Sequence, residues 1–274
     1  MNKLTRSLLG LSLVLAGSCI AAAQEKPMGN QSVLQITREY TKPGKAGMAH
    51  EVTESSFVQA MARAKWPTHY LGMTSLSGQA RALFLTFYPS FDAWEKDNQA
   101  ADKNTELSAA LDRASVGDGE LLSSVDSSVF VFHDELSLRP MSVADLSPMR
   151  YMEVSVYHIR PGHDAEWNDA VKMVKAAYEK SVPSAHWGMY EQMFGGDGGT
   201  FVVFTARKTL AEIDQAFLDD KRFEAAMGED GMKKLDGLVS ASIESSQHQL
   251  FQFNAHMSYV ADEWIKADPA FWKP

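Results

Sequence analysis

The feature that most constrains the fold of this chain is an internal repeat. Three short segments of the first half return in the second half in the same order, each about 117 residues further on. The matching segments are 40–45 with 158–163, 67–73 with 183–189, and 126–128 with 244–246. Because three anchors keep their order and spacing, the sequence predicts two tandem copies of one folding unit.

Each copy reads as strand, helix, strand, strand, helix, strand. Alternating apolar residues predict the strands, and apolar residues at helical spacing predict the helices. In the first copy we expect strands at 33–41, 69–75, 81–88 and 125–136, with helices at 45–64 and 91–114. In the second we expect strands at 151–159, 185–194, 200–206 and 247–254, with helices at 165–181 and 210–238. The predicted units are therefore 33–136 and 150–256, with a linker at 137–149 and a C-terminal tail at 257–274. The tail carries Trp264 and Trp272, which we expect to pack across the rest of the fold or against a partner.

This element order, with Pro-Gly turns at 42–44 and 160–162 before the first helix of each copy, resembles the dimeric α/β-barrel, or ferredoxin-like, superfamily. That superfamily includes antibiotic-biosynthesis monooxygenase-like and NIPSNAP-like domains. The resemblance implies an α+β fold in which two ferredoxin-like βαββαβ units form a pseudo-dimeric α/β barrel with the helices outside. Since both units lie in one chain, the barrel can close without a second subunit, and we expect a monomer or a homodimer. The superfamily contains monooxygenases, isomerases, haem enzymes and binding domains, so the fold does not fix the function.

Residues 1–23 are typical of a secretory signal peptide. Lys3 and Arg6 precede an apolar run, and small residues lead to an Ala-x-Ala site that ends at Ala23. The apolar run is shorter than the roughly 20 residues that a membrane span needs. Cleavage after Ala23 predicts a periplasmic or secreted protein, and the alternative is a lipoprotein anchored through Cys19.

Composition excludes several classes of function. Cys19 is the only cysteine, so a chain cut after Ala23 can form no disulfide, thiolate nucleophile or cysteine metal site. The formal net charge is −9, which argues against nucleic acid or an anionic membrane surface as a partner. The rest of the chain has no second long apolar run, so the sequence predicts no membrane span. A small-molecule ligand is therefore the partner that we expect.

The first strand of each copy carries polar residues at alternate positions. Alternation with a period of two sends successive side chains to opposite faces of a sheet. We expect the more apolar set to face the helices, and the polar set to point into the barrel. The polar set is Gln35, Thr37, Glu39, Glu153, Ser155 and Tyr157, and the more apolar set is Leu34, Ile36, Arg38, Tyr40, Met152, Val154, Val156 and His158. A carboxylate inside a barrel is costly unless it is paired, hydrated or used, although a hydrated barrel centre without a ligand explains the same pattern.

Histidines differ between the copies, since Tyr70 of the first aligns with His186 of the second. A neutral imidazole can act as a general base or ligate a metal or haem, whereas a strand histidine bonded to a neighbour is the structural alternative. We take His186 as the first candidate for a catalytic base and Glu153 as the second. The candidate ligand-binding residues are Glu39, Tyr70, Tyr157, His158 and Trp187.

The spacing of histidines and carboxylates matches no metal motif, so the sequence predicts neither a metal nor a cofactor. The glycine-rich segment 195–199 joins two predicted strands, and no helix opens after it, which favours a hairpin turn over a phosphate loop.

Two hypotheses of different classes follow. The first is an exported protein that binds a small apolar or aromatic molecule in the barrel cavity. The second is a cofactor-independent monooxygenase or isomerase, as the resemblance implies, in which His186 or Glu153 deprotonates an aromatic substrate beside Tyr157 or Trp187. Whether the protein is an enzyme is left open by the sequence.

Overall fold

The computed structural model describes residues 33–141 and 143–273, so the predicted signal peptide with Cys19 and Ala23 lies outside the described residues. The first half runs β1 (Val33–Thr41), α1 (Met48–Ala64), β2 (Tyr70–Ser75), β3 (Arg81–Tyr88), α2 (Phe91–Lys103), α3 (Thr105–Gly119) and β4 (Leu122–Phe132). After α4 (Val143–Leu146), the second half runs β5 (Tyr151–Ile159), α5 (Asp164–Ser181), β6 (Gly188–Phe194), β7 (Thr200–Arg207), α6 (Ala211–Ser242) and β8 (Ile243–Phe253). The tail holds a 3-10 turn (Ala255–Met257), α7 (Asp262–Ala267) and α8 (Pro269–Trp272). In this part of the chain, no helix combines the length and the apolar character that crossing a membrane requires.

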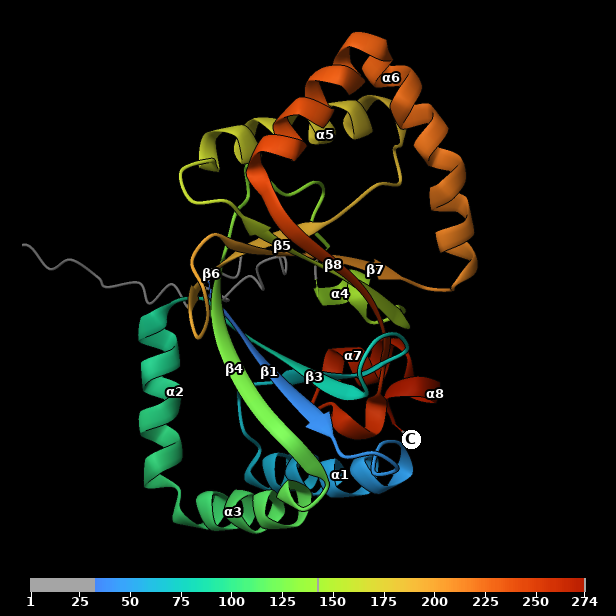
Figure 1. Ribbon diagram of the computed structural model, residues 1–274. Helices are drawn as coiled ribbons and strands as arrows, with labels where there is room; N and C mark the ends of the chain where they lie inside the picture. Colours follow the sequence, from blue (N-terminus) through green and yellow to red (C-terminus); the bar gives the residue numbers. More distant parts are fainter. Residues whose placement is uncertain (1–32, 142, 274) are drawn as a thin grey trace, which may run out of the picture.

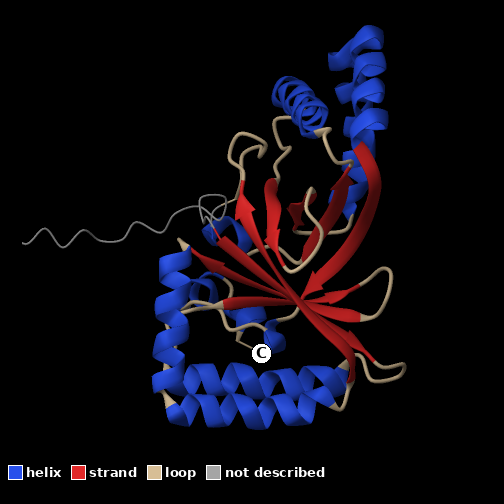
Figure 2. Cartoon of the chain, turned by 60° about the vertical axis from the view of Figure 1, so that its left-hand side comes forward, coloured by secondary structure: helices blue, strands red, loops and turns tan. Residues whose placement is uncertain are grey.

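The eight strands form one antiparallel sheet that closes into a barrel (Figure 1). The strand order is β1-β3-β2-β8-β5-β7-β6-β4, and pairing of β4 with β1 completes the circle. Each half therefore supplies four neighbouring strands in the same relative order. Helices α1 and α3 lie on one side of the barrel, and α5 and α6 lie on the opposite side (Figures 1 and 2). The predicted α+β fold, with two ferredoxin-like units in a pseudo-dimeric barrel, is confirmed, while an origin by duplication stays a prediction.

The two halves of the barrel meet at two pairs of strands, and the pairing of β2 with β8 is the shorter of these seams. The two strands pair over three residues each, and Gly72 extends the seam. The Gly72 N–H donates to Ser258 Oγ at 2.9 Å, and its carbonyl accepts from the Asn254 N–H at 3.0 Å. A Cβ at Gly72 would lie 2.3 Å from the carbonyl oxygen of Met257. Only glycine permits so close an approach of the two chain segments.

The barrel interior is an apolar core to which both halves contribute. Leu34 and Ile36 of β1 share one buried cluster with Met152 and Val154 of β5. Large side chains of the other strands complete this cluster, among them Phe130, Tyr190, Phe204, Phe251 and Phe253. The set of alternate positions that was expected to face the helices therefore faces inward.

The prediction that the polar set points into the barrel is wrong. Glu39 bonds instead to His50 of α1, and the ring of Tyr157 lies 5.2 Å from that of Trp167 on α5. The physical reason is the closed barrel itself. Its interior excludes water, so polar groups there lose hydration, whereas the outer face offers both water and helix side chains as partners.

The C-terminal tail packs onto the barrel, as expected. Trp264 and Trp272 belong to the same buried cluster as the strand side chains. The Trp272 indole N–H donates to the carbonyl of Ser147 at 2.8 Å. Arg150 forms an ion pair with Asp268 of the tail and places its guanidinium 3.9 Å from the ring centre of Phe271. The tail is therefore part of the folded core.

The second helical region of each half is interrupted, and one unbroken helix was predicted only for the first half. The helix expected at 91–114 is two helices that meet at Asn104, whose side chain accepts from the Leu107 N–H at 3.0 Å and caps α3. Helix α6 is kinked at Gly228, which has φ +66° and ψ 170°. A residue other than glycine rarely adopts that backbone conformation.

Candidate functional site

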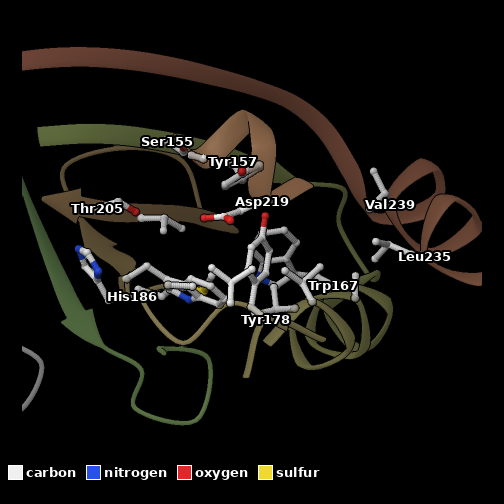
Figure 3. Close-up of a pocket in the computed structure, with 18 of the residues that line it drawn as sticks. Ser155, Tyr157, Trp167, Tyr178, His186, Thr205, Asp219, Leu235 and Val239 are labelled. Carbon is white, nitrogen blue, oxygen red and sulfur yellow. The ribbon is translucent and has the colours of Figure 1, made fainter. Parts of the chain in front are cut away.

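A cavity of about 380 Å³ lies in the second half, between the outer face of the barrel and the helices that cover it (Figure 3). Ser155 and Tyr157 of β5 and Thr205 of β7 lie along the sheet side, and Trp167 of α5 and Asp219 of α6 lie on the helix side. Ser155 and Tyr157, two of the three outward residues of β5 expected to point into the barrel, thus line a cavity outside it.

The kink in α6 allows both arms of this helix to line the cavity. Asp219 comes from the arm before Gly228, and Leu235 and Val239 come from the arm after it. In Figure 3 these two groups approach the cavity from different directions. A straight helix of this length would present only part of one face to a cavity of this size.

Aromatic side chains form much of the cavity wall. The ring of Tyr178 packs edge-on against Trp187 at 5.7 Å, and Trp167 lies beside Tyr157. The indole Nε1 of Trp167 is buried, and no acceptor reaches it among the described residues. Flat walls of this kind favour a planar apolar ligand, and the indole N–H is a donor available to a ligand oxygen.

Polar groups gather at the end of the cavity away from Leu235 and Val239. Arg207 lines the cavity, and its Nε donates to Glu153 Oε1 at 2.6 Å. Glu153 itself lies behind this arginine and does not line the cavity. Asp219, which is 6% exposed, accepts from Arg222 at 2.9 Å and from Gln215 at 3.2 Å. The cavity thus has an apolar end and a polar end that holds both a cation and a carboxylate.

The two tyrosines of the cavity are donors at neutral pH. Burial, together with the nearby carboxylate of Asp220, raises the pKa of Tyr178 to about 12. Burial also raises the pKa of Tyr157. Both phenols therefore keep their protons and cannot serve as bases near pH 7.

His186 lines the cavity, but both of its ring nitrogens are engaged. Nδ1 lies 2.9 Å from the carbonyl oxygen of Ser184, and Nε2 lies 2.9 Å from that of Ala206. The strand expected at 185–194 begins only at Gly188, so His186 lies on the segment before β6. His69 likewise precedes β2. In this geometry neither nitrogen of His186 is directed to a substrate.

The other predicted site residues lie in different parts of the structure. Trp187 and Tyr157 line the same cavity as His186, and Glu153 adjoins it. His158 bonds through Nδ1 to Thr200 Oγ1 at 3.0 Å at one mouth of the barrel. Glu39 and Tyr70 belong to the first half. The structure therefore brings together four of the seven predicted site residues.

One cavity at a mouth of the barrel is polar. It is a cavity of about 320 Å³ at the mouth beside His158, and Arg38, Arg81 and Asp126 line it. Arg38 pairs with Asp126 at 2.7 Å. Packed apolar side chains fill the middle of the barrel, and another cavity, of about 590 Å³, lies beside the inward-facing Leu71, Leu85 and Phe87, so an apolar ligand in the barrel stays a prediction. The aromatic cavity lies outside the sheet.

The first half holds a buried group of titratable side chains instead. Glu39, His50, Glu54 and Asp118 each have one possible ligand atom within 4.8 Å of those of the other three. Desolvation, followed by the charges of Glu39 and Asp118, raises the pKa of Glu54 to about 10. The spacing in the sequence gave no metal motif because these residues come from β1, α1 and the end of α3, which meet only in the fold.

The helix side of the cavity, formed by Trp167, Tyr178 and Asp219, was not predicted from the sequence. A signal for the first two exists, since Trp167, Val171, Val174 and Tyr178 recur at helical spacing and share one face of α5. Asp219 had no such signal, because its approach to the cavity depends on the kink at Gly228.

Comparisons with known proteins agree on the fold. No family model matches the chain, and no curated protein matches its sequence. Among solved structures, a protein provisionally named a monooxygenase from Fusobacterium nucleatum is similar, with a TM-score of 0.50 and 11% identity, over 81% of this chain and 91% of that one. An anthrone oxidase-like protein is similar with a TM-score of 0.50 and 11% identity, over 83% of this chain and 93% of that one.

These similarities define the class of the protein at the level of fold. The chain has the dimeric α/β-barrel fold, with both halves of the barrel contained in one chain. At 11% identity, the activities of the similar proteins do not transfer with the fold.

The kink that shapes the cavity gives a first prediction. Gly228→Ala forces a Cβ onto φ +66°, and we expect it to lower the free energy of unfolding by about 1–3 kcal/mol in urea denaturation. Gly237→Ala, on the second arm of the same helix with open space around its Cβ, is the matched control and should raise it by about 0.5–1 kcal/mol. Equal changes in the free energy of unfolding for the two substitutions would contradict a positive φ at Gly228.

Proposed function

We propose that this protein binds a small planar aromatic molecule in the cavity between β5, β7, α5 and α6. The observation that carries the proposal is the cavity of about 380 Å³ with an aromatic wall and one polar end. Cavities of about 150 Å³ hold a single benzene ring, so this one has room for about two or three rings. A hydroxyl or keto group on the ligand would meet the polar end, where Arg207, Thr205 and Asp219 lie.

Binding is tested with 1-naphthol as the probe in isothermal titration calorimetry. Val171→Trp fills the cavity with an indole, and we expect it to raise Kd at least about tenfold. Val116→Trp is the control, since Val116 is 75% exposed on α3 of the other half. An unchanged Kd in Val171→Trp, or an equal loss in both variants, would contradict binding in this cavity.

Oxygenation of the bound molecule is the second candidate function. The two similar structures, named as a monooxygenase and as anthrone oxidase-like, favour it. In such a reaction a ring CH₂ group next to a carbonyl-bearing ring system loses a proton to a base, and the carbanion reacts with O₂. One CH₂ and one O₂ give one C=O and one water. Asp219 is the base that we assign, because its two hydrogen bonds both go to Oδ1, whereas both nitrogens of His186 face backbone carbonyls.

Oxygen uptake with anthrone as substrate tests this second candidate. We expect one O₂ consumed for each anthraquinone formed, and a loss of turnover of about 100-fold or more in Asp219→Asn. Asp214→Asn, an exposed aspartate on the same helix, is the control and should retain turnover. A loss in His186→Ala with turnover intact in Asp219→Asn would assign the base to His186. No uptake by the unaltered protein would leave ligand binding alone.

Export is also part of the proposal, and the predicted signal peptide supports it. When the chain is expressed in a bacterial host, we expect the mass of the periplasmic protein to correspond to a chain that begins at Gln24. A mass that includes lipid on Cys19 would identify the alternative lipoprotein. A cytoplasmic protein that retains Met1 would contradict export. Monomer and homodimer both remain predictions, since the barrel closes within one chain.

A further inference from the structure

The group of four titratable side chains in the first half lies where three elements meet. Glu39 comes from the outer face of β1, His50 and Glu54 come from successive turns of α1, and Asp118 lies at the end of α3. His50, Glu54 and Asp118 are 2–4% exposed. The aromatic cavity of the second half is on the opposite side of the barrel, so this group is independent of the proposed function.

His50 lies near all three carboxylates. Its Nε2 is 3.1 Å from Glu39 Oε2, 3.3 Å from Asp118 Oδ1 and 3.9 Å from Glu54 Oε1. Ligand atoms held about 2.1 Å from one ion lie at most about 4.2 Å apart. The largest separation here is 4.8 Å, so side-chain movements of a few tenths of an ångström would bring the four atoms around one ion.

The acidic side chains of this group outnumber its basic ones. Three carboxylates face one imidazole, which can carry at most a single positive charge. Among the described residues, no lysine or arginine forms an ion pair with any of the three carboxylates. Thr53 Oγ1 donates to Asp118 at 2.6 Å but adds no charge. Buried carboxylates without compensation are costly, so this group requires either protons or a cation.

A second observation points to a ligand. Glu54 Oε1 is buried and has no hydrogen-bond partner, although it is directed at the other members of the group. The hydroxyl of Tyr70 is also buried without a partner. Burial, followed by the charges of Glu54 and Glu39, raises the pKa of this tyrosine. Glu54 Oε1 is thus a buried acceptor, directed into the group, that no donor among the described residues satisfies.

We propose that Glu39, His50, Glu54 and Asp118 bind one divalent transition-metal cation, such as Zn²⁺ or Mn²⁺. One imidazole nitrogen and three carboxylate oxygens suit these ions, whereas Ca²⁺ prefers six to eight oxygen ligands. The ion joins α1 and α3 to β1 and stabilises their packing on the barrel. The second half lacks this set, because Tyr157, the seventh residue of β5, stands where Glu39 is the seventh residue of β1.

The test uses the full untagged chain after treatment with EDTA. Titration with Zn²⁺ or Mn²⁺ alone in a calorimeter should give one ion per chain, and saturation should raise Tm by about 5–10 °C. Glu54→Gln keeps the shape of the side chain and removes its charge. We expect it to weaken cation binding at least about tenfold and to abolish the rise in Tm.

The metal-free variant separates the proposal from a general loss of stability. Without a cation, Glu54→Gln exchanges a buried carboxyl that has an unsatisfied oxygen for a neutral amide of the same shape, so its Tm should equal or exceed that of the metal-free unaltered protein. Glu51→Gln is the matched control on the same helix. Its carboxylate bonds to Asn254 outside the group, and cation binding should be unchanged. Absence of stoichiometric binding and of any rise in Tm with both ions would overturn the proposal and leave a group neutralised by protons.

Discussion

Closure of the eight-stranded sheet is the constraint on which the rest of the structure depends. Because β2 pairs with β8 and β4 pairs with β6, every strand has a neighbour on both sides and no strand edge is left open. An eight-stranded barrel encloses a space that side chains just fill, so the inward positions in its middle are apolar, and charged side chains such as Arg38 and Arg81 lie at its mouth. The outward positions are then free to carry the polar residues, and the helices that cover them create the enclosed sites. For this reason the aromatic cavity and the group around His50 both lie between sheet and helix.

Most of the fold could be predicted from the sequence, and the candidate site only in part. Pro-Gly turns and period-two alternation mark the strands locally, so β1 and β5 begin and end as expected. Alternation defines two faces without saying which face is inside, because that depends on closure, and the expected orientation of Glu39 and Tyr157 was therefore inverted. Asp118 meets Glu54 only through the packing of α3 against α1, and no local pattern encodes such a meeting.

The two halves share their strand order but differ in chemistry at corresponding positions. The first half places Glu39 opposite a histidine and two further carboxylates, and its outer surface there is charged and buried. The second half places Tyr157 opposite Trp167, and the corresponding space is apolar and holds a cavity. The expectation that the second half is the better place to seek a ligand stays a prediction, since a cavity of about 590 Å³ also lies beside Tyr70 and Leu85 of the first half. The same framework thus supports two local environments of opposite polarity.

Containment of both halves in one chain has an evolutionary consequence. In a barrel assembled from two identical subunits, any substitution appears twice, and a change that benefits one side is imposed on the other. Here the seventh residues of β1 and β5 are encoded by separate codons, so one side can acquire a carboxylate while the other acquires a tyrosine. Selection can therefore act on each side of this barrel separately, under the shared requirement that both seams, β2 with β8 around Gly72 and β4 with β6, stay closed.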